Sequence, residues 1–295
     1  MQKLARALSA ITAEPLLRVA MAPLFLALAL VCLSPTSAAA ELLLAVVPQL
    51  PPAVTHRQWR PLVERLAHDT GLPIQLRVYR SFDEFESDLN GGRPDLVYLN
   101  PYQQLVARRA QGYIPLVRDG SRLLSGVLVV RKDSPYQSVK DLDGRDIAFP
   151  DPNAFAASLY MRALLREREH IRFQARYLAG HGNVYRHTIL GEVAAGGGVN
   201  VTLARERVQT RNELRILYET PGTPPHPLSA HPRVNKTTRA VLTAALLKLA
   251  DSNNGRQLLA DIEMPGPVPA DQVRDYAALE RLNLQRYATV SPPWP

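Results

Sequence analysis

The stretch Asp95-Leu-Val-Tyr-Leu-Asn-Pro-Tyr102 predicts a strand that runs directly into a helix. An apolar run forms the strand, Asn100 is a favoured N-cap residue, and Pro101 suits the first helical position. The junction places Tyr98, Asn100 and Tyr102 at the carboxyl end of a strand, where ligands bind in open α/β sheets. Free backbone N–H groups at the start of the helix favour an anion there. The competing interpretation is a good helix start with tyrosines that serve only the core.

Strands and helices alternate along the rest of the chain. Continuous apolar runs predict buried strands, and apolar residues at helical spacing predict the helices between them. Such alternation is typical of α/β sheets with parallel strands. The predicted strands are 42–47, 74–78, 126–130, 147–149 and 214–218, and the predicted helices include those that end at Gly71 and Gly191 and the nearly continuous helical region from Asn235 onward.

A second strand-to-helix junction is predicted at Phe149-Pro-Asp-Pro-Asn-Ala-Phe-Ala-Ala-Ser158. Asn153 can cap the helix, and the small residues up to Ser158 let a ligand approach the backbone. Phe155 could supply an apolar wall. The competing interpretation is a helix that needs alanines to pack tightly on its sheet.

A third candidate is the glycine-rich region Ala179–Tyr185, followed by Gly191–Asn200. His181 is expected on a glycine-flanked loop, free to reach a cavity, with Tyr185 nearby. The triple glycine at 196–198 indicates that the backbone passes close to another group. A solvent-exposed histidine on a loop is the competing interpretation.

The composition excludes several classes of protein. The chain has 295 residues and a single cysteine, Cys32, which excludes a disulfide-stabilised scaffold and a thiolate metal site. Its formal net charge is +8, but the basic residues are interspersed and no run of five occurs, so nucleic acid is not an expected partner. The sequence contains no Gly-x-Ser-x-Gly, P-loop or His-Glu-x-x-His motif. We therefore expect no catalytic residues, no cofactor and no metal site.

The first forty residues have the pattern of a secretory signal peptide. Basic residues precede an apolar run from Met21 to Leu33, and small residues follow it. The run is shorter than the ~20 residues that a membrane-spanning helix needs. We predict cleavage after Ala40 and a periplasmic mature protein. The alternative is a lipoprotein acylated at Cys32, although Val31 is larger than the residue that generally precedes such a cysteine.

Taken in order, these segments resemble the phosphate/phosphite/phosphonate substrate-binding proteins of ABC transporters, the PhnD-like family. The resemblance extends from Leu42 to about Tyr287. Each motif alone is weak evidence for the family, whereas the whole set, in this order and at these spacings, is specific to it. The motifs are Val46-Val-Pro-Gln49, Trp59-Arg-Pro-Leu62, Asp95–Tyr102, Val129–Pro135, Asp141-Leu-Asp-Gly144, Asp151-Pro-Asn153, Gly180-His181, Leu190-Gly191 and Pro221-Gly-Thr-Pro224.

The resemblance implies the α/β fold of type II periplasmic binding proteins, with two lobes joined by two crossing hinge segments. Each lobe would be a mixed sheet flanked by helices. Residues 1–40 would be the signal peptide, residues 41–126 with 222–295 the first lobe, and residues 127–221 the second lobe. The residues expected around the ligand are Gln49, Tyr98, Asn100, Tyr102, Asn153, Ala154, Phe155, Ala156, Ser158, His181 and Tyr185.

The implied function is that of a non-catalytic solute-binding protein, acting as a monomer. It would bind a small anionic or polar solute of the phosphonate class between the lobes and pass it to the membrane permease of an ABC importer. Two other functions stay open on the same fold. One is a sensory binding protein for a membrane receptor or kinase, and the other is an enzyme.

The chain departs from the family at two places that bear on the ligand. Phosphonate binders carry a Ser-Thr-Ser run where this chain has Ala154-Phe155-Ala156, so hydroxyl donors, each worth roughly 1.5–3 kcal/mol to a charged group, are absent. The backbone N–H groups of that segment remain as the expected contacts. Ala194 stands where the family typically has an acidic residue that can pair with a ligand's ammonium group. Its presence predicts that the ligand is not an aminoalkylphosphonate.

Overall fold

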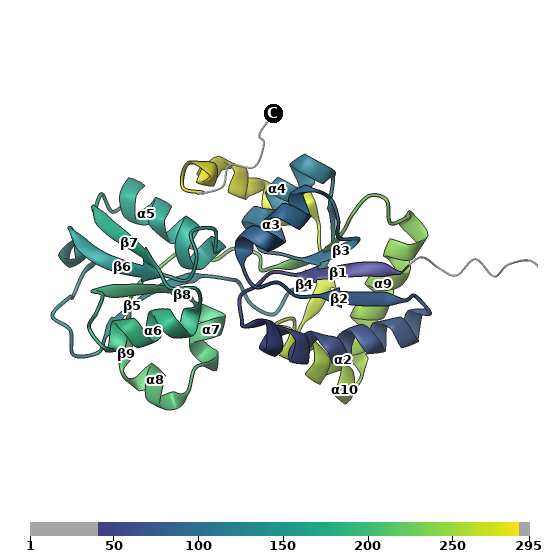
Figure 1. Cartoon of the computed structure of the whole chain (residues 1–295), viewed down its shortest axis with the longest axis horizontal. Coiled ribbons are helices and arrows are strands. Elements are labelled where there is room, and N and C mark those ends of the chain that lie inside the picture. The colour runs from purple at the N-terminus through teal and green to yellow at the C-terminus, as the bar shows by residue number, and fades with distance from the viewer. Residues whose placement is uncertain (1–40, 289–295) are drawn as a thin grey trace, which may run out of the picture. The chain divides into compact units, whose positions relative to one another are not determined.

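The computed structural model of the protein describes residues 41–288, which form two mixed β-sheets flanked by helices (Figure 1). The predicted signal peptide, its cleavage after Ala40 and the alternative acylation of Cys32 lie outside the described residues. Within residues 41–288, no helix combines the length and the apolar composition needed to cross a bilayer.

The first sheet has the strand order β11-β4-β10-β3-β1-β2, in which β2, β1 and β3 are parallel and the other pairs are antiparallel. Val46 in β1 lies opposite Tyr98 in β3, so both strands end at the same edge of the sheet. The strands are β1 (Leu42–Val46), β2 (Ile74–Arg77), β3 (Leu96–Tyr98), β4 (Ile114–Asp119), β10 (Pro227–Ala230) and β11 (Pro267–Pro269), and the α-helices of this lobe are α2 (Pro52–Thr70), α3 (Phe82–Asn90), α4 (Pro101–Gln111), α9 (Lys236–Lys248) and α10 (Asn253–Asp261).

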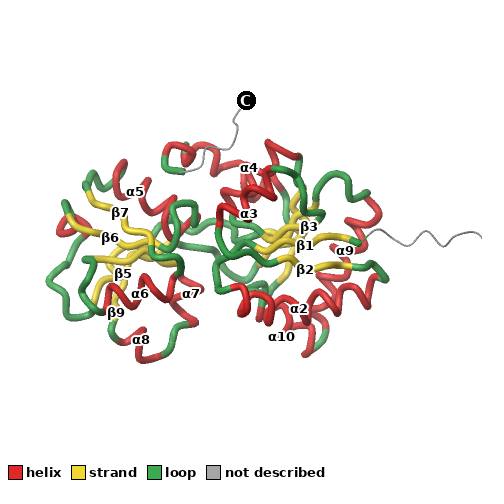
Figure 2. Tube along the Cα trace, in the orientation of Figure 1, coloured by secondary structure: helices red, strands yellow, loops and turns green. Residues whose placement is uncertain are grey.

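The second sheet, whose strands are yellow in Figure 2, has the order β7-β6-β8-β5-β9. Here β7, β6 and β8 are parallel, and β5 pairs antiparallel with β8 and β9. The strands are β5 (Gly126–Arg131), β6 (Arg145–Phe149), β7 (Phe173–Tyr177), β8 (Ala195–Val199) and β9 (Leu214–Glu219), and the helices are the π-helix η2 (Phe155–Tyr160), α5 (Met161–Glu167), α6 (His181–Ile189), α7 (Asn200–Arg205) and α8 (Val208–Asn212).

Two segments connect the sheets and pair with each other. Residues 120–125 lead from β4 to β5, and residues 220–226 lead from β9 back to β10. Leu124 and Thr223 exchange two backbone hydrogen bonds, with N···O distances of 2.8 and 2.9 Å. The lobes therefore share a double connection, as expected for two crossing hinge segments. The exact lobe boundaries stay a prediction.

The junction at Asn100 forms the helix start that the sequence predicts. Asn100 Oδ1 accepts a hydrogen bond from Gln103 N at 2.8 Å, and Asn100 N donates to Gln103 Oε1 at 3.1 Å, which completes a capping box. Asn100 Nδ2 also donates to the backbone carbonyl of Asn153, at 3.3 Å. This side chain therefore caps α4 and contacts the second lobe.

We expect Asn100→Ala to lower the free energy of unfolding by about 2 kcal/mol, because it removes a helix cap and a buried hydrogen bond between the lobes. Asn235→Ala is the matched control, since Asn235 caps α9 only through Thr238 N. Its expected cost is about 1 kcal/mol. Urea titrations of both variants check the difference, and equal losses would show that the contact with Asn153 contributes nothing.

Strand β8, which the sequence analysis does not predict, explains the triple glycine. It contacts η2 and α6. A Cβ on Gly197 would lie within 3.0 Å of the Ala157 carbonyl oxygen, and a Cβ on Gly196 would lie equally close to Val184. The glycines therefore let two helices approach the sheet closely, and their presence needs no ligand.

The other differences from the predicted elements have local causes. Strands β4, β10 and β11 are not predicted from the sequence, because they contain prolines and proline disfavours the interior of a sheet. Strand β7 is also not predicted from the sequence, whereas the mixed sheets that the resemblance implies are confirmed. Helix α6 begins at His181, which is therefore the first helical residue and buried, not part of a solvent-exposed loop.

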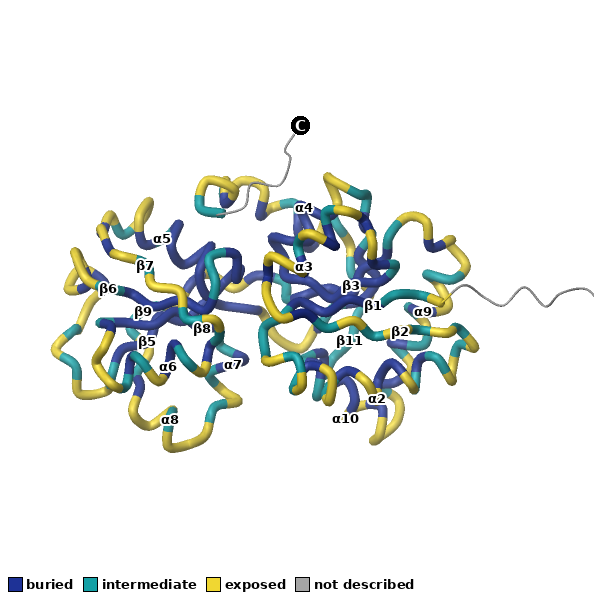
Figure 3. The backbone as a smooth tube through the Cα atoms, in the orientation of Figure 1, coloured by how far each residue is buried: buried dark blue, intermediate teal, exposed yellow. Residues whose placement is uncertain are grey.

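The largest apolar core extends through the first lobe and into the second. Residues of β1, β3 and α2 pack with residues of η2, and Leu284 near the end of the described chain joins them. The buried segments of both sheets appear dark blue in Figure 3. This shared apolar core links η2 of the second lobe to the first lobe.

Candidate functional site

Two cavities, of about 110 and 550 Å³, share one wall. Gln49 and Arg80 come from loops of the first lobe, and Ala179–His181 lie before and at the start of α6 in the second lobe. The cavities therefore form a cleft between the lobes. The residues common to both are Pro48, Gln49, Arg80, Ala179, Gly180 and His181.

His181 is the buried polar residue of this shared wall. Its side chain is only 6% exposed, and its Nδ1 has no hydrogen-bond partner among the described residues. Burial lowers the pKa of the imidazole to about 4, so the ring is neutral at pH 7. A neutral ring with an unsatisfied nitrogen is unusual in a folded protein and is suited to bind a polar ligand.

Tyr98 and Gln49 meet at a second histidine. The Tyr98 ring lies between Trp59, with centroids 4.8 Å apart, and His226, at 5.4 Å with nearly parallel planes. Gln49 Nε2 lies 3.0 Å from His226 Nε2. Burial, together with nearby His181, lowers the pKa of His226 to about 3, so His226 is neutral and its Nε2 accepts the hydrogen bond from Gln49. His226 thereby orients Gln49 in the cleft.

The start of η2 reaches the cleft through Ala154 and Phe155, whereas Ala156 is buried and lines neither cavity. Ala154 and Phe155 line the smaller cavity. The first helical hydrogen bonds here run from Ser158 N and Leu159 N to the Ala154 carbonyl. The N–H groups of Phe155 and Ala156 precede these bonds, so they belong to the helix start that lacks intrahelical acceptors.

Asn153 joins the lobes rather than lining either of the two large cavities. Its N–H donates to Asp151 Oδ1 at 2.8 Å, and its Nδ2 donates to Glu86 Oε2 at 3.0 Å. Glu86 Oε1 accepts a second bond, from Gln103 Nε2 at 3.0 Å. Burial raises the pKa of Glu86 to about 7, although both amide donors favour its ionised form.

The structure places five other predicted ligand residues away from the two large cavities: Tyr98, Tyr102, Ala156, Ser158 and Tyr185. Ser158 Oγ contacts Pro152 O and accepts from Arg162 Nε. Tyr185 is fully buried, and its hydroxyl lies 3.0 Å from Thr202 Oγ1. Tyr102 lines only a small cavity of about 20 Å³ beside Glu86, where its hydroxyl has no partner within the described part of the chain.

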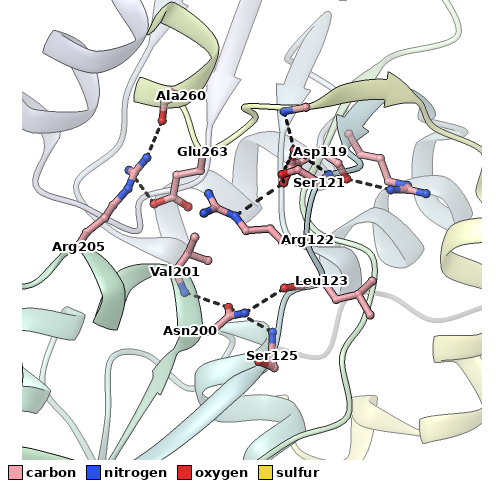
Figure 4. Close-up of polar contacts among 12 residues, drawn as sticks. Asp119, Ser121, Arg122, Leu123, Ser125, Asn200, Val201, Arg205, Ala260 and Glu263 are labelled. Atoms are coloured by element: carbon pink, nitrogen blue, oxygen red, sulfur yellow. Dashed lines mark hydrogen bonds and ion pairs between the residues drawn. The ribbon is translucent and has the colours of Figure 1, made fainter. Parts of the chain in front are cut away.

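An ion pair between residues that line the larger cavity links the two lobes (Figure 4). Arg205 Nη1 lies 2.9 Å from Glu263 Oε1, and Arg205 Nη2 donates to the Ala260 carbonyl at 2.6 Å. Burial raises the pKa of Glu263, and the neighbouring Arg205 and Arg122 oppose that rise. Beside it, Asn200 bonds to Leu123 and Ser125 in the first crossing segment. These contacts hold the lobes together around the cavities.

Several residues in and around the cleft belong to no sequence motif. Arg80 and Glu263 line the cavities, whereas Glu86 and His226 contact residues that the sequence predicts, Asn153 and Gln49. The only feature of the sequence that points to His226 is its position in the proline-rich segment that returns to the first lobe. No group of three or more His, Cys, Asp or Glu residues within residues 41–288 is arranged to hold a metal ion.

The geometry defines a two-lobe binding protein with a cleft at the carboxyl ends of its parallel strands. Residues 44–276 match the model of a protein family that is described as the periplasmic substrate-binding protein of phosphonate ABC transporters. The chain therefore belongs to this family, as the resemblance implies. A search of curated proteins finds no significant match.

Solved structures confirm the predicted fold class. A binding protein component of an ABC phosphonate transporter, PA3383 from Pseudomonas aeruginosa, is similar with a TM-score of 0.74 and 13% identity, over 84% of this chain and 87% of that chain. PhnD1 from Prochlorococcus marinus, in complex with methylphosphonate, has a TM-score of 0.73 and 16% identity, over 83% and 97%. A histidine kinase sensor domain similar to periplasmic binding proteins has a TM-score of 0.55 and 15% identity, over 79% and 99%.

Proposed function

We propose that this protein binds a small solute with an anionic group in the cleft between its lobes and delivers it to the permease of an ABC importer. It acts as a monomer, by hinge closure and without chemical conversion of the solute. The single observation that carries the proposal is His181, a buried and neutral histidine with an unsatisfied nitrogen, on the wall that both cavities share.

The proposed ligand contacts come from both lobes. Gln49, oriented by His226, contributes an amide from the first lobe. His181 and the N–H groups of Phe155 and Ala156 contribute donors from the second. A ligand that contacts both sides stabilises the closed arrangement, because it binds only when the lobes are together. Tyr98, Asn100, Tyr102, Asn153, Ser158 and Tyr185 support these contacts through packing and hydrogen bonds.

Calorimetric titration with methylphosphonate, ethylphosphonate, phosphite and phosphate tests the proposal. At least one compound is expected to bind with a Kd below about 1 mM, and at 100 times the Kd to stabilise the protein by about 2.7 kcal/mol. His181→Ala should weaken that binding at least tenfold. His68→Ala, at an exposed position on α2, is the matched control and should leave Kd unchanged. Binding that is insensitive to His181→Ala would contradict the site.

A second candidate function is sensing, and the likeness to a kinase sensor domain favours it. The two functions differ in the membrane partner of the ligand-bound protein. An importer predicts that the loaded protein stimulates ATP hydrolysis by its permease in lipid vesicles. Absence of stimulation, with ligand binding intact, would favour the sensory function.

A further inference from the structure

The last helical turns of the described chain are anchored to the first lobe. The 3₁₀-helix η5 (Ala277–Leu282) contacts α4, and Glu280 Oε2 lies 3.1 Å from Arg109 Nη2 of that helix. Tyr276, just before η5, is fully buried, and its hydroxyl donates to the Pro225 carbonyl at 2.9 Å. These contacts fix the beginning of the segment on the first lobe.

The same segment then reaches the second lobe. The 3₁₀-helix η6 (Leu284–Arg286) brings Arg286 and Tyr287 to α5. Arg286 Nη1 lies 3.3 Å from Glu167 Oε1, and the Tyr287 hydroxyl donates to the same oxygen at 2.9 Å. The Tyr287 carbonyl accepts a hydrogen bond from Arg162 Nη2 at 2.8 Å. The lobes are therefore connected at this edge as well as through the two crossing segments (Figure 1).

Arg162 joins this contact to the cleft. Its side chain is buried in α5, and the same Nη2 donates to the Pro152 carbonyl at 2.6 Å. Pro152 directly follows Asp151, which lines the smaller cavity. A buried charged group that loses a hydrogen-bond partner is costly. Contact with Tyr287 therefore stabilises the guanidinium that holds the loop at Pro152.

Only a short piece of chain separates the two anchors. Glu280, which binds the first lobe, and Arg286, which binds the second, are six residues apart in the sequence. Such a piece spans about 12 Å as a 3₁₀-helix and at most about 20 Å when fully extended. Wide opening of the lobes at this edge therefore has to unwind η5 and η6 or release one of the anchors.

We propose that residues 280–288 form a C-terminal strap that favours the closed arrangement of the lobes, and that release of this strap from Glu167 and Arg162 permits full opening. The inference goes beyond the proposed function, because it concerns the protein without a solute. A contact that exists only when the lobes are together shifts the equilibrium toward the closed arrangement.

The contacts on the second lobe are suited to reversible release. Glu167 and Arg286 are both exposed, and exposed ion pairs each add little to stability. The strap therefore shifts the equilibrium without locking the lobes. Since Arg162 also holds Pro152, release of the strap would loosen the loop beside the smaller cavity as the lobes open.

Reversal of one charge tests the strap without disturbing the core. Glu167→Arg places two positive charges opposite each other, at the exposed position where α5 meets Arg286. The double variant Glu167→Arg with Arg286→Glu restores an ion pair of opposite polarity. Glu192→Arg is the matched control, because Glu192 is an exposed acid of the second lobe that pairs with His187 of the same lobe.

Distances between spin labels on the two lobes provide the measurement. Cys32 is the only cysteine of the sequence, so Cys32→Ser gives a background in which labels at Arg60→Cys and Arg176→Cys are unique. Both positions are exposed, one on α2 and one on β7. Double electron–electron resonance of the solute-free protein then gives the distribution of distances between the lobes.

The population with the longer distance is expected to rise about threefold in Glu167→Arg. It should return to the wild-type value in the charge-swapped double variant and stay at that value in Glu192→Arg. An unchanged distribution in Glu167→Arg, an equal change in Glu192→Arg, or a charge swap that restores nothing would overturn the inference. No solute enters this experiment, so its outcome is independent of the proposed function.

Discussion

Replacing Gly197 with alanine is expected to lower the free energy of unfolding by about 3 kcal/mol. A Cβ at this position would lie within 3.0 Å of the Ala157 carbonyl oxygen and of the Phe149 ring. The backbone of η2 would have to move away from β8, and overpacking of this kind typically costs about 1–3 kcal/mol. For a domain of this size, the melting temperature should fall by roughly 6–12 °C.

Gly182→Ala is the matched control for this prediction. Gly182 lies in α6 of the same lobe, and a Cβ there would meet only Glu206 Oε1, at 3.9 Å. Because alanine favours a helix over glycine by about 1 kcal/mol, the control should be neutral or stabilising. Thermal unfolding by circular dichroism gives both values. A small effect at Gly197 would show that η2 packs less closely on the sheet than described.

Glu86→Gln is expected to change how stability depends on pH. Burial raises the folded-state pKa of Glu86 to about 7 from its ordinary value of 4.5, so the folded protein favours the protonated acid. The stability contribution of this group is complete below pH 4.5 and is lost as the pH rises through 7. At 1.36 kcal/mol for each unit, the loss is about 3 kcal/mol.

The difference between the wild type and Glu86→Gln isolates this group. His181 and His226 act in the opposite direction, since their pKa values are lowered to about 4 and 3 and their contribution is lost as the pH falls below 6.5. Both histidines remain in the variant. We therefore expect the variant to gain stability relative to the wild type between pH 5 and 8 in urea titrations.

Glu64→Gln, on the exposed face of α2, is the control and should follow the wild type at every pH. A constant difference between Glu86→Gln and the wild type would show that Glu86 does not titrate in this range. Since Glu86 contacts Asn153 across the lobes, the pH dependence would also report on the contact between them.

Much of the fold could be predicted from local sequence. Apolar runs identified β1, β3 and β5, and Asn100-Pro101 identified the start of α4, because strand burial and helix capping depend on neighbouring residues. Proline-containing strands were missed, since their pairing depends on distant partners. The glycine strand β8 was missed for the same reason, because the helices that make glycine necessary come from other parts of the chain.

The amino-acid sequence alone determined the class of protein, the family and one residue of the shared cleft wall in each lobe, Gln49 and His181. Only the tertiary structure decided which charged side chains line the cleft. Arg80, Asp151 and Glu206 lie far apart along the chain, and folding alone places them around one cleft. Local sequence patterns indicate hydrogen bonding and burial within one segment. The charge of a cleft depends on side chains from several segments, which only the complete fold brings together.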